Sequence, residues 1–495
     1  MNKIKQIALK YWADFILKKW NQDCEVPQKI FEQNLKFIQK HSKQSNVLKI
    51  KNINELRQLP LTNYSNYQST FKESLNIGFN PLNGEKIKFW ATSTGSSGTP
   101  KLFPISKSVK KTSKPFQKIR ASLLIKKFNI WTGQPELIFV LPGEVDVLHP
   151  KRKIGQIGYY FQSQTPKWLK KQFIFSKALY KNVNDFNHWH IVIALLSDCS
   201  GITTSIPSRL THFLNQINFN RLEIRQIILN KEYPKKYIIS TSQKRINYIL
   251  KILEKPLVSI KDIWPSLTFV CLWKSGKVCN TQMNELTSSY DFKNVKLIDQ
   301  IYNSSEDIFN IPLINEIGGP LNIYNHLIEF YDSTKNIYLW PWEIKPNRTY
   351  DIVITNSMGL TRYQVYDKII CTGFYKNTPK IAFHSRSLPE ISLGWCVITE
   401  KEIQQALDDS DIIDFSTFYF TLNKKGNGLT IISFNKKLAL IIEKINKSLE
   451  TQNKNYKKQI NLGNVLPISF QIVNQSSYNA FFLKHPNNKR IFIFQ

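Results

Sequence analysis

The chain has 495 residues, 42% of them hydrophobic, so it can bury a large core and is long enough for more than one domain. It carries 68 basic and 36 acidic residues, a formal net charge of +32 at pH 7, which suits a nucleic-acid partner or an anionic substrate such as a nucleotide. Because lysine is spread along the chain and no arginine-rich tail occurs, we interpret most of the charge as a solvated surface. We therefore expect no nucleic-acid partner.

Cysteine and histidine spacing gives little support to a metal site. The six cysteines lie far apart without a Cys-x-x-Cys pair, which argues against a zinc ribbon or a disulfide scaffold and fits a reducing compartment. No secretory leader is visible, so we expect a cytoplasmic protein.

His188 and His190 have a strand-like spacing that packing or a turn explains. The apolar run at 191–196 is too short to cross a bilayer, so we expect no membrane partner.

Residues 1–67 have helical periodicity, with a break at Leu59-Pro60. The first twenty residues place apolar side chains on one helical stripe, namely Ile4, Ile7, Ala8, Tyr11, Trp12, Phe15 and Ile16. We expect this amphipathic helix to dock against the rest of the protein, with binding to a membrane surface as the alternative.

Strand signals then alternate with longer amphipathic segments, which predicts an α/β protein with a mostly parallel sheet. The predicted strands are residues 86–91, 136–141, 268–273, 295–298, 327–331 and 350–355. Two further runs, 368–372 and 380–384, flank residues 373–379 and predict a hairpin.

After about residue 386 the pattern changes to a shorter segment with predicted helices and short strands. The helices are residues 401–408 and 438–448, and the strands are 415–422 and 429–432. We therefore predict two domains, a large one at 1–386 and a small α+β domain at 387–495.

Residues 93–101 read Ser-Thr-Gly-Ser-Ser-Gly-Thr-Pro-Lys and follow an apolar stretch. Glycine allows close backbone approach to an anion, successive N–H groups form an anion nest, and Lys101 adds a mobile charge. The spacing differs from that of a Walker loop. We interpret the segment as a polyphosphate loop, with a plain serine-glycine turn or linker as the alternative.

A dense basic segment follows this loop, comprising Lys107, Lys110, Lys111, Lys114, Lys118 and Arg120. Its side chains could steer polyphosphate toward the loop, or they could simply be the solvated face of a helix.

Residues 302–306, Tyr-Asn-Ser-Ser-Glu, come soon after the predicted strand 295–298. Loops at the carboxyl ends of strands in α/β sheets are common ligand sites. Tyr302 offers a flat face to a base, a serine offers a donor to phosphate, and Glu306 offers oxygen ligands to Mg²⁺.

The third motif runs from Gly359 to Arg386 and contains Asp367 at the end of a mixed polar and apolar run. A carboxylate there can accept hydrogen bonds from both hydroxyls of a ribose, each worth roughly 1.5–3 kcal/mol. An N-cap or a surface ion pair is the alternative role for this residue.

The first motif resembles the phosphate loop of acyl-adenylate-forming enzymes, and the third resembles one branch of them, the acyl acid amido synthetases of the Gretchen Hagen three family. That family has the pattern Gly-Leu-x-Arg-Tyr-Arg-x-Gly-Asp, then Val-Thr-Gly-Phe-x-x-x-x-Pro, then Phe-x-x-Arg. The matching residues here are Gly359, Leu360, Arg362, Tyr363, Asp367, Thr372, Gly373, Phe374, Pro379, Phe383 and Arg386. The resemblance implies an adenylate-forming domain with a small carboxyl-terminal lid domain.

The resemblance also implies an activity. Such enzymes use ATP and Mg²⁺ to adenylate a carboxylic acid and pass the acyl group to an amino acid amine, giving an amide, AMP and pyrophosphate. The implied nucleotide-binding residues are Ser96, Ser97, Gly98, Thr99, Tyr302, Ser304, Ser305, Asp367, Phe374 and Arg386. The implied catalytic residues are Lys101, Glu306 and Lys484, with Glu306 as the Mg²⁺ ligand. The acyl pocket is expected near Ser205, Pro207 and Trp273, with ordinary core packing as the alternative role of these residues. The protein is expected to be a monomer.

This chain departs from the family pattern at several positions. Tyr366 stands where glycine usually precedes the aspartate, Gln364 replaces an arginine, and Asp307 replaces the glycine after the metal glutamate. Residues 394–397, Gly-Trp-Cys-Val, lack the lysine of the family's Asp-x-Asp-Lys stretch. These departures keep two alternatives open: a non-catalytic homologue that binds an acyl acid or nucleotide, and a ligase that passes the acyl group to CoA.

Overall fold

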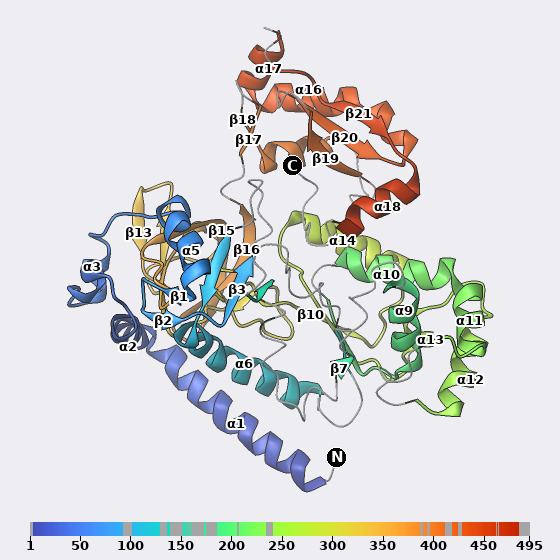
Figure 1. The fold of residues 1–495 in the computed structure, drawn as a ribbon, viewed down its shortest axis with the longest axis horizontal. Coiled ribbons are helices and arrows are strands. Elements are labelled where there is room, and N and C mark those ends of the chain that lie inside the picture. The colour runs from blue at the N-terminus through green and yellow to red at the C-terminus, as the bar shows by residue number, and fades with distance from the viewer. Residues whose placement is uncertain are drawn as a thin grey trace.

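The structure is a computed structural model of the chain. It describes residues 3–92, 101–128, 136–138, 152–155, 157, 160, 173–174, 186–204, 207–233, 241–386, 390–393, 397–410, 418–423, 428–461, 463 and 465–484. Helices and sheets alternate along the chain, so the predicted α/β class is confirmed (Figure 1).

The amino-terminal region is helical, as expected. Its helices are α1 (Lys3–Glu25), α2 (Pro27–Lys40), α3 (Ser45–Leu48), α4 (Ile53–Leu56) and α5 (Ser65–Ile77). Pro27 stands at the first position of α2, where a missing N–H costs no hydrogen bond. The apolar stripe of α2 is buried against the six-stranded sheet described below.

Helix α1 lies along α6 (Lys107–Phe128), as Figure 1 shows, but it docks through a different face from the predicted one. Trp20 is only 1% exposed, whereas Ile4 and Tyr11 are 72% and 73% exposed. The helix has two opposite apolar faces, and only the face with Trp20 contacts the protein. The helix docks as expected, but Ile4, Ile7, Tyr11 and Phe15 of the predicted stripe are exposed, and of its larger apolar members Ile16 packs against the core.

Two short strands flank the serine-glycine segment. Strand β3 (Phe89–Thr92) pairs antiparallel with β4 (Leu102–Ile105), and Thr92 faces Leu102. Strand β6 (Ile154–Gly155) pairs with β3 on its other side, and β1 (Phe79–Asn80) and β2 (Glu85–Lys86) form a separate small hairpin. Residues 93–100 themselves lie outside the described residues, but their two ends are fixed beside each other.

A five-stranded parallel sheet follows, in the order β10-β9-β8-β5-β7. Its strands are β5 (Glu136–Ile138), β7 (Phe173–Ile174), β8 (Gly201–Thr203), β9 (Phe269–Leu272) and β10 (Lys296–Asp299). The predicted strands beginning at 136, 268 and 295 are thus confirmed. Gly201 is required at its position because a Cβ there would lie 2.3 Å from the Phe269 ring.

Helices accompany this parallel sheet. They are α9 (Phe186–Leu196), α10 (Pro207–Phe219), α11 (Arg221–Leu229), α12 (Gln243–Ile252), α13 (Ile260–Ile263) and α14 (Lys277–Ser289). His188 and His190 lie in α9, so the strand-like interpretation of their spacing is wrong. The apolar run that follows them is the buried end of the same helix.

The six-stranded sheet has the order β11-β16-β15-β14-β12-β13, and its pairs are antiparallel. Its strands are β11 (Gly319–Pro320), β12 (His326–Asp332), β13 (Ile337–Leu339), β14 (Thr349–Asn356), β15 (Tyr363–Tyr375) and β16 (Thr378–Arg386). The strands expected at 327–331 and 350–355 exist but are not parallel. The predicted hairpin is confirmed, with a tighter turn at residues 376–377.

Beyond residue 386 the chain has its own three-stranded sheet, in the order β19-β20-β21. The elements are β17 (Glu390–Ser392), β18 (Val397–Thr399), α15 (Glu400–Asp408), β19 (Phe418–Leu422), β20 (Leu429–Ser433), η4 (Lys436–Ile441), α16 (Ile442–Gln452), α17 (Lys454–Asn461), β21 (Ser469–Ile472) and α18 (Gln475–Lys484). Buried side chains between 393 and 468 form a separate apolar cluster, which is consistent with the predicted small domain; its boundary at 386/387 stays a prediction. No described helix is both long and apolar enough to cross a membrane.

Candidate active site

The ends of the serine-glycine segment lie close to aromatic residues of the amino-terminal helices. Lys101 Nζ lies 5.6 Å from the centroid of the Tyr64 ring, at the start of α5. The Leu102 N–H donates to Tyr64 Oη at 2.8 Å. Ser96, Ser97, Gly98 and Thr99 lie outside the described residues, so their expected contacts with phosphate stay predictions.

The segment 302–306 contacts both of the other motifs. It follows the carboxyl end of β10, where a ligand-binding loop is expected. Ser305 Oγ donates to the Thr92 carbonyl at 2.9 Å, at the root of the serine-glycine segment. Tyr302 Oη donates to Asp367 Oδ2 at 2.8 Å, in the third motif. Three motifs that are up to 275 positions apart in the chain (92 to 367) therefore meet in space.

Tyr302 is buried, and its ring belongs to an aromatic cluster. The ring centroids of Phe309, Phe383 and Trp273 lie 4.6, 5.7 and 6.2 Å away from it. Trp273, which follows β9, also meets Phe383 edge-on at 5.7 Å. Phe383 thus lies at the candidate site although only its place in the motif, and no expected role, pointed to it.

Glu306 is 8% exposed and lies near two tyrosines. Tyr363 Oη donates to Glu306 Oε1 at 3.5 Å. Burial, and then the Glu306 carboxylate, raises the pKa of Tyr363 above its ordinary value. Burial likewise raises the pKa of Tyr64, with a smaller contribution from Glu306. Both phenols therefore stay protonated at neutral pH and are available as donors.

A single carboxylate such as Glu306 suits Mg²⁺, which proteins hold with one or two carboxylates while substrate phosphates supply further oxygens. Among the residues that the structure describes, no group of three acidic, histidine or cysteine side chains gathers into a metal cage. The donor set thus fits a metal ion shared with a nucleotide.

Asp367 is almost fully buried in the middle of β15, and its register partner on β16 is Arg386. The β14–β15 pairing slips next to it: Asp351 faces Lys368, whereas Val353 faces Gln364. One residue of β14 is therefore opposite three of β15, an irregularity that bends a strand and re-aims its side chains. Here the re-aimed carboxylate meets the Tyr302 hydroxyl.

Several expected site residues lie elsewhere or are only partly described. Phe374 is seven residues beyond Asp367 on the extended strand β15, about 23 Å along it, and is 38% exposed. The structure does not bring Phe374 to the other motifs, because an extended strand carries its two ends apart. Pro207 is buried at the start of α10, and Lys484 ends α18. Ser205 lies outside the described residues.

The basic segment of α6 has two faces. Lys107, Lys111, Lys114 and Lys118 are exposed, as the solvated-face alternative predicts. Arg120 points inward instead and donates to the backbone oxygens of Pro312 at 3.0 Å and Asp299 at 3.3 Å. It therefore holds the end of β10 in place.

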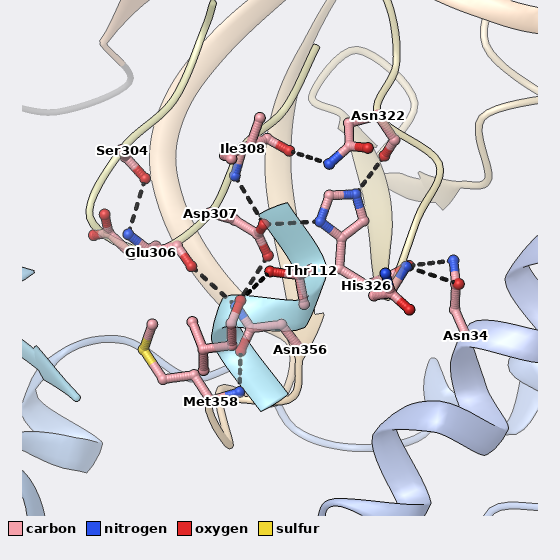
Figure 2. Close-up of polar contacts among 12 residues, drawn as sticks. Asn34, Thr112, Ser304, Glu306, Asp307, Ile308, Asn322, His326, Asn356 and Met358 are labelled. Carbon is pink, nitrogen blue, oxygen red and sulfur yellow. Dashed lines mark hydrogen bonds and ion pairs between the residues drawn. The ribbon is translucent and has the colours of Figure 1, made fainter. Parts of the chain in front are cut away.

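A small cavity of about 20 Å³, room for roughly one water molecule, lies behind the segment 304–308. Its lining is Ile105, Val109, Thr112, Ile157, Ser304, Ser305, Glu306, Asp307, Ile308, Asn356, Ser357 and Met358. Sequence reasoning did not anticipate the buried polar contacts beside it, which Figure 2 shows around Asp307 and His326. The only sequence signal was the departure from glycine at position 307.

Two stretches of the chain match models of one protein family. A family model described as the GH3 family N-terminal domain matches residues 16–287, and one described as the GH3 family central domain matches residues 321–386. The 4-substituted benzoates-glutamate ligase GH3.12 of Arabidopsis thaliana is 25% identical over 164 residues, covering 31% of this chain and 28% of that protein. The jasmonoyl–L-amino acid synthetase JAR4 of Nicotiana attenuata is 29% identical over 100 residues, or 18% and 17% of the two chains. The aligned segments thus span less than a third of either relative.

The similarity in structure is much more extensive than the similarity in sequence. The solved structure of the AtGH3.15 acyl acid amido synthetase in complex with 2,4-DB has a TM-score of 0.76 with this chain, at 16% identity. The superposition covers 98% of this chain and 94% of that one. The two chains therefore share a fold over nearly their whole lengths.

Proposed function

The chain belongs to the GH3 family, and from that premise we propose that it is an ATP-dependent acyl acid amido synthetase. In the first step a carboxylate oxygen of the acid attacks the α-phosphorus of ATP, and the bond to the bridging oxygen of the β-phosphate breaks. Pyrophosphate leaves and an acyl-adenylate remains. In the second step an amino acid amine attacks the acyl carbonyl, AMP leaves with the C–O bonding pair, and the amine gives up a proton.

One observation carries the proposal: the segment 302–306 touches both the root of the serine-glycine segment and Asp367. An adenylating enzyme needs its phosphate, base and ribose contacts around one nucleotide, and it works by holding the reactants in position. We assign Asp367 to the ribose hydroxyls, Tyr302 to the adenine side and Ser305 to the α-phosphate. The phosphate loop would supply Ser96, Ser97, Gly98, Thr99 and Lys101, while Ser304 and Arg386 are assigned on the resemblance alone.

Glu306 would hold Mg²⁺, with Tyr363 donating to one of its carboxylate oxygens. The metal ion supplies charge neutralisation for the pyrophosphate that leaves. Lys101, whose Nζ lies next to the Tyr64 ring, would add positive charge on the phosphate side. Lys484 is the proposed cation from the small domain, which would move between the two half-reactions as a lid.

The proposed substrates are a small carboxylic acid and an amino acid, because the relatives described above are a 4-substituted benzoates–glutamate ligase and a jasmonoyl–amino acid synthetase. We place the acid near Trp273, whose ring adjoins Tyr302 and Phe383. Ser205 and Pro207 are assigned to the same pocket on the resemblance alone. A monomer located in the cytoplasm remains part of the proposal.

ATP–pyrophosphate exchange over a panel of aryl, indole and fatty acids tests the proposal. We expect exchange with at least one acid, and mass spectrometry should then detect an amide when mixed amino acids are added. Asp367→Ala should abolish exchange. Nucleotide binding without exchange for any acid would favour the non-catalytic alternative, and a thioester formed in preference to an amide would favour the CoA ligase.

A further inference from the structure

Asp307 and His326 form a buried ion pair directly beside Glu306. His326 begins β12 and is fully buried, and its Nδ1 lies 2.9 Å from Asp307 Oδ1. Its other ring nitrogen, Nε2, contacts the backbone oxygen of Asn322. A carboxylate and a carbonyl oxygen can only accept hydrogen bonds, so both contacts are satisfied only when each ring nitrogen carries a proton. The pair is therefore an imidazolium facing a carboxylate.

Electrostatics support this protonation state. Burial opposes the charge on the ring, but the Asp307 carboxylate and the two hydrogen bonds outweigh it and raise the pKa of His326 above its ordinary value.

Asn356, the last residue of β14, ties the same carboxylate to the backbone of the glutamate. Its Nδ2 donates to Asp307 Oδ2 at 3.1 Å and to the Glu306 carbonyl at 3.0 Å. Asp307 also accepts from the Ile308 N–H at 2.8 Å, and its carbonyl accepts from the Ser304 N–H at 2.9 Å. Figure 2 shows His326 on one side of this segment and the Glu306 side chain on the other.

The histidine is itself anchored to a distant helix. Asn34, on α2, donates to the His326 carbonyl at 2.8 Å and accepts from the Asn325 N–H at 2.8 Å. Asn322, whose carbonyl contacts the ring, donates through Nδ2 to the Ile308 carbonyl at 3.0 Å. The network therefore joins α2, β12 and β14 to the backbone of the segment 304–308.

We propose that the Asp307–His326 pair is a positioning device that holds Ser305 and Glu306 in place for Mg·ATP. The inference rests on the proposed function, since it assigns a role to residues behind the proposed metal ligand. Groups that fix a metal-binding carboxylate typically change metal affinity or activity roughly 10- to 100-fold when they are removed.

Two variants and a double variant test the pairing. Asp307→Asn keeps the shape without the charge, and His326→Gln keeps a donor without the charge. We expect each to weaken Mg·ATP binding in calorimetry roughly tenfold and to raise the half-saturating Mg²⁺ concentration in exchange, with a smaller change in kcat. The double variant should lose no more Mg·ATP affinity than the single variant with the larger loss, because the two substitutions remove the same interaction.

The matched control is His41→Gln. His41 Nδ1 lies 3.2 Å from Glu85 Oε1, so this variant also breaks a histidine–carboxylate pair, but one that makes no contact with the segment 304–308. Its Mg·ATP affinity should equal that of the wild type. A tenfold loss in this control, or additive losses in the double variant, would overturn the inference.

Amide hydrogen exchange over residues 302–309 gives a readout that needs no substrate. We expect faster exchange in both variants than in the wild type or the control. Should a variant not fold, Asn356→Ser keeps the ion pair and should show the same direction of change. It removes the two Nδ2 hydrogen bonds, together with the one that Asn356 Oδ1 accepts from the Met358 N–H at 3.1 Å. If the wild type binds Mg·ATP in calorimetry but the variants keep its amide hydrogen exchange and its Mg·ATP affinity, only this inference is overturned. If titration of the wild type with Mg·ATP releases no heat, the proposed function is overturned as well.

Discussion

Tyr366 has a φ of 61°, in the left-handed region that disfavours a side chain. Tyr366 directly precedes Asp367 in the irregular part of β15. Arg362, the residue just before β15, also has a positive φ, of 42°. Arg362 holds its conformation with a bidentate contact to Glu329, at 3.0 and 2.9 Å, and with bonds to two backbone oxygens of the amino-terminal region. The buried arginine therefore offsets the local strain that aims the aspartate.

Removing Arg362 should destabilise the protein strongly. Arg362→Leu leaves the Glu329 carboxylate, which is 2% exposed, without its cation. A buried pair broken on one side costs about 3–5 kcal/mol in the free energy of unfolding, which denaturant titration would measure. Arg348→Leu is the control, because that side chain is 49% exposed and lies 3.8 Å from Asp332. Equal losses in the two variants would contradict the prediction.

The His326 pair predicts how stability depends on pH. The pKa of His326 is raised in the folded protein above its ordinary value of 6.5, so folding favours the protonated ring. That contribution is complete below about pH 6.5, the unfolded value, and is lost as pH rises through the folded pKa. Thermal unfolding from pH 6 to 9 should therefore show a loss of stability in the wild type that His326→Gln lacks. Identical pH profiles would disprove the link.

Helix α1 illustrates at the level of elements why a helical stripe does not reveal which side is buried. The face with Trp20 packs against the core, and Trp20 stacks on Tyr375 at 5.0 Å, while Phe15 on the opposite face is 68% exposed. Asp14, between the two faces, pairs with Lys126 of α6 at 2.8 Å. Periodicity predicted the helix, but its docked face depends on α6 and β15, which the local sequence does not contain.

Trp20 and Phe15 should respond oppositely to truncation. Trp20→Ala removes a buried indole and should lower the free energy of unfolding by about 3–5 kcal/mol. Phe15→Ser should change it by less than about 0.5 kcal/mol and should improve solubility, because it removes an exposed ring. Urea titration of both variants gives the measurement. A large loss from Phe15→Ser would show that something covers that face.

The strands show where local pattern is enough. Strand signals at 350–355, 368–372 and 380–384 predicted β14 and the β15–β16 hairpin, because a run of strand-forming residues is a local property. The relative direction of β12 and β14 was not predictable. These two strands pair antiparallel, and the path of the segment that connects them depends on long-range packing. The motifs predicted Tyr302, Ser305, Glu306 and Asp367 as neighbours, but no local signal pointed to His326, which enters from another strand.

In the whole molecule, buried apolar side chains gather in separate clusters among the described residues. One joins the amino-terminal helices to the six-stranded sheet, and a second lies between the parallel sheet and its helices. A third contains only residues from 393 to 468. The candidate site lies where the first two regions meet, since Tyr302 belongs to the first cluster and Trp273 follows a strand of the parallel sheet.

Because the third cluster shares no member with the other two, we expect the segment after residue 386 to unfold separately. Scanning calorimetry should resolve at least two transitions. Mg·ATP at 100 times its Kd adds about 2.7 kcal/mol to the stability of the state that binds it. The described site contacts lie between residues 64 and 383. Only the transition temperature of the larger part should therefore rise. A single transition with equal calorimetric and van't Hoff enthalpies would show one cooperative unit instead.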